Sequence, residues 1–164
     1  MKRSEVNRIL RESDAFMRAH GQILPPFAYW SPDEMRAKRN AIAGIVGRRL
    51  GWDITDYGQG DFARRGLFLF TARNGDAADL RKGRGMLYAE KIMLPRRDQL
   101  GPMHRHNVKA EDIINRGGGV LAIKLFTSGP DGLIDRGQDV TVPTDGVMGP
   151  FPAGGILRLS PGES

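Results

Sequence analysis

The feature that most constrains the fold is a change in the sequence pattern at Trp52. Beyond this residue, short apolar runs alternate with Gly, Pro, Asn and Asp at regular intervals. Runs of about four to eight apolar and β-branched residues that end at turn-forming residues are typical of strands in antiparallel sheets. The chain from residue 51 onward is therefore predicted to be all β.

Several strands are expected in this part of the chain. Turn signals separate them at Asn74-Gly75, at Gly129-Pro130-Asp131-Gly132 and at Thr144-Asp145-Gly146. The predicted strands comprise residues 66–72, 86–94, 102–106, 111–115, 119–126, 140–142 and 155–159.

A first helix is predicted near the start of the chain. Apolar residues such as Ile9 and Met17 recur there at helical spacing, while charged residues occupy the other positions. Ser4 can cap this helix, which should continue to about His20. Gly21 is its natural end, because glycine readily adopts the left-handed conformation that terminates helices.

A second helix is predicted from Pro32 onward. Ser31 and Glu34 have the spacing of a capping box, and proline is favoured at the first helical position. The pattern continues to about Leu50. Two helices followed by many antiparallel strands indicate a small barrel or jelly roll with the helices packed outside.

The composition fits one soluble domain. With 164 residues and 40% hydrophobic content, we expect a single domain over residues 1–164, with a helical segment 1–50 and a β part 51–164. The absence of cysteine excludes disulfides and thiolate metal sites and agrees with a reducing cytoplasm. No apolar run approaches the ~20 residues of a membrane span, so a cytoplasmic protein without a membrane partner is predicted.

Positive charge is concentrated in the first part of the chain. The net charge is +6, and residues 1–49 hold ten Lys or Arg against five Asp or Glu. Such a segment can indicate nucleic-acid binding. However, aromatic residues do not alternate with the charges as a base-stacking surface would require, so a solvated helical face is favoured and no nucleic-acid partner is expected.

A candidate metal site lies at His104 and His106. Residues two apart in a strand point to the same face, so the two imidazoles would lie side by side. Glu111 could return on the next strand as a third ligand, and Gly117-Gly118-Gly119 would form a tight hairpin turn after it. Two His and one carboxylate suit a divalent cation that also binds substrate or water. His-x-His alone is common in solvated strands, so the prediction depends on the carboxylate and the glycines.

The same segment resembles a known family. The spacing His104-x-His106-x4-Glu111-x6-Gly118 matches the first histidine motif of the cupin superfamily. The wider sequence is similar to the bacterial D-lyxose isomerases from the first residue to the last. The blocks that carry this similarity are residues 1–7, 24–32, 51–56, 88–93, 102–104 and 111–119.

The resemblance implies both a fold and an activity. The fold would be a mainly β, cupin-type antiparallel β-barrel or jelly roll with two N-terminal helices packed outside. The activity would be that of a metal-dependent aldose–ketose isomerase acting on a small sugar, D-lyxose to D-xylulose and also D-mannose to D-fructose, through an enediol-type proton transfer. Manganese(II) suits two imidazoles, one carboxylate and sugar oxygens, with zinc or cobalt as alternatives.

The chain departs from the family at its end. The family's sites, as the resemblance implies, use a fourth ligand, a histidine on a strand after a Pro-Gly turn, whereas this sequence stops at Ser164. We therefore expect a C-terminally truncated β part that binds metal weakly and isomerises lyxose poorly. A non-catalytic sugar- or metal-binding cupin is the alternative. A cupin dioxygenase would share the ligands but not the surrounding blocks.

Two lysines are candidate catalytic residues. Lys109 lies between His106 and Glu111, and alternation would place its ammonium on the face of the carboxylate, where it could polarise a sugar hydroxyl. Lys91 alternates with Ala89 and Met93, which indicates an inward-pointing charge that is costly without a polar site. A solvent-facing side chain is the alternative for both lysines. A homodimer is also expected, since sheets of this kind commonly pair through their edges.

Overall fold

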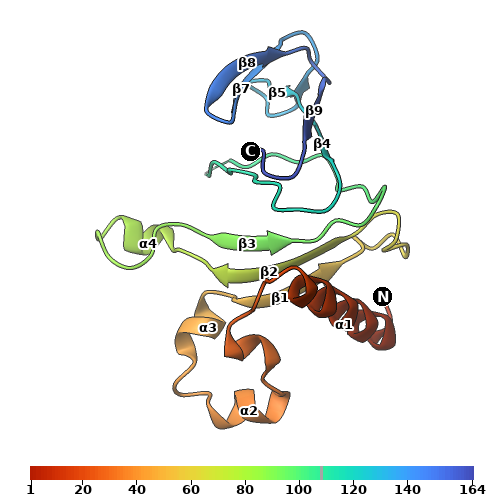
Figure 1. Ribbon diagram of the computed structural model, residues 1–164. Coiled ribbons are helices and arrows are strands. Elements are labelled where there is room, and N and C mark those ends of the chain that lie inside the picture. Colours follow the sequence, from red (N-terminus) through yellow and green to blue (C-terminus); the bar gives the residue numbers. More distant parts are fainter. Residues whose placement is uncertain (108) are drawn as a thin grey trace. The chain divides into compact units, whose positions relative to one another are not determined.

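The computed structural model describes residues 1–107 and 109–164. The chain forms two compact units, Met1–Pro102 and Met103–Ser164 (Figure 1). From Gly51 onward the described chain is built mainly on antiparallel strands, which confirms the predicted mainly β class. The single domain over residues 1–164 stays a prediction.

The first helix of the first unit, α1, spans Arg3–Ala19. Ile9 and Met17 are buried on one face, as the apolar spacing predicts. Ser4 lies inside the helix instead of capping it, and no side chain caps this end. The predicted end at Gly21 is confirmed, because that residue adopts φ +74° and cannot continue a right-handed helix.

The second predicted helix is interrupted. Its capping box is present, and α2 spans Pro32–Ala37, but the chain then turns and α3 spans only Ala43–Gly47 instead of continuing to Leu50. Glycine lowers helix propensity by ~1 kcal/mol relative to alanine, and both Gly44 and Gly47 lie within α3, which agrees with its short length. Neither short helix has a buried residue, so packing does not offset that cost.

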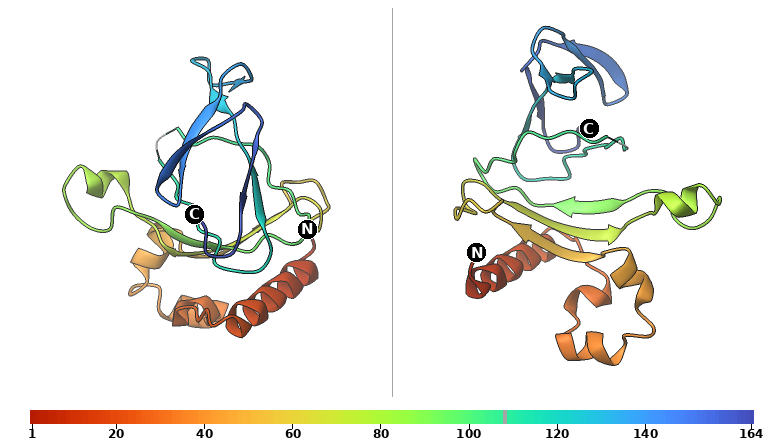
Figure 2. Two further views of the ribbon diagram at one scale, coloured as in Figure 1. Left: turned by 45° about the horizontal axis from the view of Figure 1, so that its top comes forward. Right: turned by 180° about the vertical axis from the view of Figure 1, so that it is seen from behind.

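A three-stranded antiparallel sheet forms the centre of the first unit. Strand β2 (Leu67–Arg73) lies between β1 (Gly51–Thr55) and β3 (Glu90–Met93). The helices α1, α2 and α3 lie on one side of this sheet (Figure 2). Strand β1 was not predicted, and β3 is shorter than the predicted strand 86–94.

The core of the first unit lies between this sheet and the helical segment. Phe68 and Phe70 alternate along β2 and are almost fully buried. The Trp52 ring packs against Phe70 with centroids 5.0 Å apart, and its Nε1 donates to the Ala28 carbonyl at 2.7 Å, which fixes the short 3-10 helix η1 (Pro26–Tyr29) over the sheet. The buried core residues are Ile9, Met17, Leu24, Phe62, Phe68 and Phe70.

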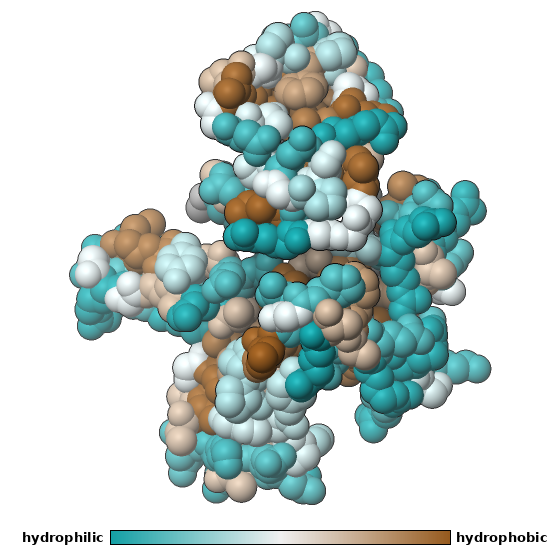
Figure 3. Space-filling model, viewed as in Figure 1, coloured by the Kyte–Doolittle hydropathy of each residue, from teal (hydrophilic) through white to brown (hydrophobic). Residues whose placement is uncertain are grey.

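A short helix, α4 (Ala77–Leu80), lies in the connection from β2 to β3 and projects beyond the end of the sheet (Figure 1). Figure 3 shows apolar side chains gathered over it, and both Leu80 and Leu87 are more than half exposed. Asp76 caps the helix by accepting from the Ala78 N–H at 2.7 Å. The sequence pattern did not predict this element.

The second unit consists of paired strands. Strand β4 (Leu121–Lys124) pairs with β9 (Ile156–Leu159). The short strands β5 (Thr127–Ser128) and β6 (Ile134–Asp135) pair with each other. The last pair is β7 (Val140–Thr144) and β8 (Val147–Phe151), joined by the predicted turn at Asp145 and Gly146.

Two predicted strands are absent from the described residues. Segments 102–106 and 111–115 have no strand structure. The Asn115 N–H donates a hydrogen bond to the Glu163 carbonyl at 2.9 Å, and the Asn115 carbonyl accepts one from the Gly162 N–H at 2.7 Å. These two bonds join Asn115 to the C-terminal turn without a strand ladder. The described strands therefore form separate two- and three-stranded sheets, and no closed barrel is present among them, which is consistent with the predicted cupin-like β fold.

Within the same described ranges, no helix has both the length and the apolar character needed to cross a bilayer.

Candidate metal centre

The candidate metal ligands lie in the second unit, on the irregular segment that precedes β4. His104 and His106 are in its first part, and Glu111 follows after a short stretch. One ligand atom from each of the three side chains lies within 4.8 Å of the others. In residues 1–107 and 109–164, no other such group of three or more His, Cys, Asp or Glu side chains is found.

The three side chains approach one another closely. The His106 Nε2 atom lies 3.0 Å from Oε2 of Glu111. The rings of His104 and His106 meet edge to face, with centroids 4.9 Å apart and an interplanar angle of 77°. All three residues are exposed, so an ion or a small molecule can reach them from solvent.

Glu111 also contacts Lys109. The Lys109 Nζ forms an ion pair with Oε1 of Glu111, so the ammonium does lie beside the carboxylate, as predicted. Partial burial acts to raise the pKa of Glu111, but the hydrogen bond and charge of Lys109, together with His106, outweigh it. The pKa of Glu111 is therefore below its usual range, and the carboxylate is charged at neutral pH.

The donor set fits a divalent cation. Two imidazole nitrogens and a carboxylate oxygen are ligands that zinc, manganese and related ions accept, and an exposed site leaves positions for water or substrate. Atoms bound to one ion at ~2.2 Å are at most ~4.4 Å apart. The ligand atoms lie up to 4.8 Å apart, so a small rotation of these exposed side chains is needed before all three can bind the same ion.

A buried asparagine fixes the far end of this segment. The Asn115 amide donates to the carbonyls of Gly119 and Leu159 at 2.9 and 2.8 Å. Its oxygen accepts from the Gly117 N–H at 3.1 Å. Leu159 is in β9, so this side chain ties the ligand-bearing segment to the β4–β9 pair. The three glycines thus form a loop closed by Asn115 and not the predicted hairpin between strands.

Asn115→Ala is expected to lower the free energy of unfolding by about 2–4 kcal/mol, because it removes three hydrogen bonds of a buried side chain. Urea denaturation measures this loss. Asn107→Ala, at an exposed position of the same unit, is the matched control and should change stability by less than about 0.5 kcal/mol. Equal effects of the two substitutions would contradict the proposed bridging role of Asn115.

Comparison with known proteins identifies the family. A family model described as D-lyxose isomerase matches residues 1–164. The chain belongs to the D-lyxose isomerase family. This membership confirms the predicted enzyme class, an aldose–ketose isomerase.

Two curated relatives support the same assignment. The D-lyxose/D-mannose isomerase of Serratia proteamaculans is 46% identical over 166 residues, and that of Escherichia coli O157:H7 is 45% identical over 167 residues. In both comparisons the match covers 100% of this chain and 71% of the relative.

The other predicted catalytic residue of this D-lyxose isomerase family member, Lys91, lies in the first unit. It is on β3, in register with the buried Thr71 of β2, and its side chain is exposed. Ile92, the next residue, packs against the core instead. Lys91 and Ile92 therefore lie on opposite faces of the sheet, and both the inward orientation and the catalytic role of Lys91 stay predictions.

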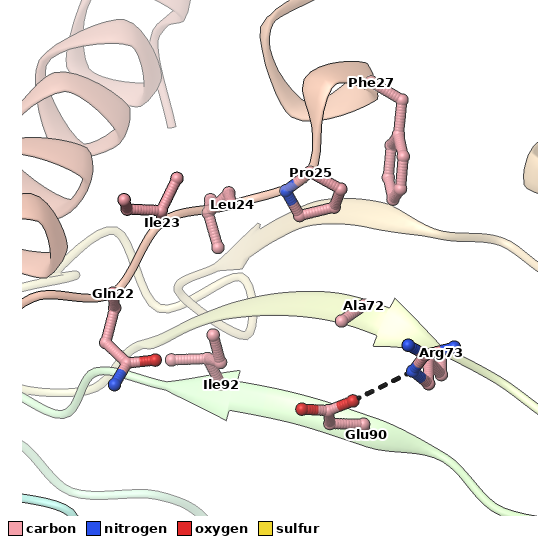
Figure 4. Close-up of a pocket in the computed structure, with 9 residues that line it drawn as sticks. All are labelled: Gln22, Ile23, Leu24, Pro25, Phe27, Ala72, Arg73, Glu90 and Ile92. Atoms are coloured by element: carbon pink, nitrogen blue, oxygen red, sulfur yellow. Dashed lines mark hydrogen bonds and ion pairs between the residues drawn. The ribbon is translucent and has the colours of Figure 1, made fainter.

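The first unit also contains a cleft of about 470 Å³ between the segment after α1 and the strands β2 and β3. Figure 4 shows that its walls are mostly apolar side chains. Its two charged residues, Arg73 and Glu90, pair with each other at 3.2 Å. Among the described residues that line it, no unpaired group suited to metal or acid–base chemistry is found.

Sequence reasoning found the three candidate ligands but missed Asn115. Its position two residues before a glycine is typical of a turn in which the Asn side chain accepts a backbone N–H, and that contact is observed with Gly117. This signal could have predicted the loop. Its bond to Leu159, far along the chain, has no local sequence signal.

Proposed function

We propose that this chain is a metal-dependent isomerase that converts D-lyxose to D-xylulose and D-mannose to D-fructose. The observation that supports this most directly is the cluster of His104, His106 and Glu111 in a member of the D-lyxose isomerase family. The curated relatives are named for lyxose and mannose. No observation favours the non-catalytic cupin considered from the sequence.

Manganese(II) is the proposed ion, with zinc and cobalt as alternatives. His104, His106 and Glu111 would hold it. Carboxylate and sugar oxygens suit a hard cation, while the two imidazoles are accepted by borderline ions. When bound, such an ion supplies a Lewis acid that polarises the sugar carbonyl and orients the adjacent hydroxyl.

Lys109 is proposed to act on the sugar directly. Isomerisation moves one hydrogen from C2 of the aldose to C1 and one proton from O2 to O1, so negative charge develops transiently on these oxygens. The Lys109 Nζ is a donor beside Glu111 and can exchange that ion pair for a hydrogen bond to a sugar oxygen. Glu111 holds the ammonium near the site until the sugar arrives.

The proposal is tested by turnover of D-lyxose, measured as D-xylulose formed. Chelation should abolish activity, and manganese(II) should restore it. Lys109→Met should lower kcat about 100-fold or more, as expected for loss of a donor to developing charge, without removing the metal. Lys82→Met, at an exposed position of the first unit, is the matched control and should leave turnover unchanged.

Turnover that is insensitive to chelation would contradict a metal-dependent mechanism. Turnover that is equal in Lys109→Met and Lys82→Met would remove Lys109 from the mechanism. Retention of metal by Lys109→Met is checked by the rise in melting temperature on addition of manganese(II), because an ion that binds the folded state stabilises it.

The proposal places this activity in a cytoplasmic homodimer. Light scattering after size-exclusion chromatography would test the oligomeric state, and a monomer would contradict it.

A further inference from the structure

A cleft in the second unit shares a wall with the candidate metal centre. Its volume is about 240 Å³, and His104 is among the residues that line it. The opposite wall is the β5–β6 hairpin, residues 127–135. The lining also includes Met103, Arg105, Phe126, Ser128, Gly132 and Leu133.

The hairpin wall is held by its own hydrogen bonds. The Gly129 N–H donates to the Leu133 carbonyl and the Gly132 N–H to the Gly129 carbonyl, both at 2.9 Å. The Leu133 N–H donates to Oδ1 of Asp131 at 2.9 Å. These hydrogen bonds fix the backbone of the turn, so the positions of its side chains along the cleft are well defined.

Arg105 is brought to the cleft by a close approach to Gly132. A Cβ atom at Gly132 would lie only 2.2 Å from a guanidinium nitrogen of Arg105, and Gly132 has φ +80°. The backbone conformation of Gly132 favours glycine, and the missing Cβ lets the flexible Arg105 side chain lie against this residue. Among the described residues Arg105 forms no ion pair, so its guanidinium donors are available to a ligand in the cleft.

The cleft combines hydroxyl-binding groups with apolar walls. Ser128 carries an exposed hydroxyl, and Oγ1 of Thr127 is buried without a hydrogen-bond partner in the described part of the chain. Phe126 and Ile134 offer apolar surface. A ligand with hydroxyls along a short carbon chain matches this combination.

We propose that this cleft binds the carbon chain of an open-chain sugar beyond the two carbons that react at the metal centre. The inference rests on the proposed isomerase function, because His104 joins the cleft to the candidate ligands. The cleft is smaller than the ~300–1,000 Å³ pockets of drug-sized ligands. Its size suits a five- or six-carbon polyol, with Arg105 and Ser128 binding its hydroxyls.

Ser128→Phe tests the proposal, because the position is exposed and a larger side chain there fills the cleft without displacing the core. Thr141→Phe, at an exposed position of β7 outside the cleft, is the matched control. Xylitol is the probe, since this five-carbon polyol has no carbonyl and cannot be isomerised. Its binding to the manganese-loaded protein is measured by saturation-transfer NMR.

Ser128→Phe should weaken xylitol binding at least about tenfold by steric exclusion, while Thr141→Phe should leave it unchanged. Arg105→Met, a second variant that leaves the hairpin intact, should weaken it about tenfold through loss of a charge-assisted hydrogen bond. Both variants should keep the rise in melting temperature with manganese(II). Equal xylitol binding in Ser128→Phe and Thr141→Phe, or no binding to the unmodified protein, would overturn the proposal.

The same measurements separate this inference from the proposed function. If the unmodified protein binds xylitol in a Ser128-dependent way but does not convert D-lyxose, the cleft is a polyol site and the isomerase proposal fails. If D-lyxose is converted with equal KM by Ser128→Phe and the unmodified protein, the isomerase proposal stands and the cleft assignment fails.

Discussion

His106→Ala is expected to abolish the rise in melting temperature on addition of manganese(II) and to lower D-lyxose turnover at least about 1,000-fold, since loss of Lewis-acid stabilisation costs several kcal/mol of barrier. The imidazole contributes one of three candidate ligand atoms and lies 3.0 Å from Glu111. Because the residue is exposed, its removal should leave folding nearly unchanged without metal. Differential scanning calorimetry with and without manganese(II) measures the first effect.

His20→Ala is the matched control for this substitution. His20 follows α1, stacks on Phe16 with centroids 4.2 Å apart, and contacts the Phe16 carbonyl through Nδ1 at 2.8 Å. Its loss removes a histidine but no candidate ligand. The metal-dependent shift should therefore persist in His20→Ala. A shift of equal size in His106→Ala would show that the ion binds elsewhere.

Phe70→Ala is expected to lower the free energy of unfolding by about 3–5 kcal/mol, the range for removal of a buried aromatic side chain that leaves a cavity. Phe70 is 0% exposed in the middle strand of the first unit's sheet. Its ring packs against Trp52 at 5.0 Å and Phe27 at 5.6 Å between centroids. Urea denaturation followed by tryptophan fluorescence measures this loss.

Phe16→Ala makes the same chemical change at a position that is 46% exposed on α1. It should cost less than about 1 kcal/mol, because little apolar area returns to water. If the two substitutions destabilised the protein equally, the core would not lie between α1 and the sheet as described.

The sequence alone predicted those structural elements whose determining residues lie close together along the chain. Apolar spacing with Ile9 and Met17 predicted the first helix, and Gly21 predicted its end. Turn residues predicted the β7–β8 connection at Asp145-Gly146. In each case the residues that determine the structure are within a few positions of one another, so their conformational preferences act without help from distant contacts.

The candidate ligands were predictable for the same reason. His104, His106 and Glu111 occur within one short segment, so their proximity follows from the covalent chain under several backbone conformations. The strand geometry first used to bring them together is absent, yet the three side chains still meet. Their spacing was therefore more informative than the secondary structure assigned to them.

Tertiary structure alone decided whether a segment with strand-like residues became a strand. A strand requires a partner backbone for its hydrogen bonds, and β4 obtains one from β9, which lies far along the chain. Segment 102–106 belongs to none of the described sheets. The short length of α3 has a similar origin, since this helix buries no residue that would offset the cost of Gly44 and Gly47.

The contacts that surround the candidate metal centre could likewise not be predicted from the sequence. Asn115 bonds to Leu159, and Arg105 packs against Gly132; both pairs are distant along the chain. Single residues carry little information about such contacts, because many partners are chemically acceptable and only the folded chain selects one. Sequence spacing thus determined which residues can bind a metal, while folding determined which side chains lie beside them.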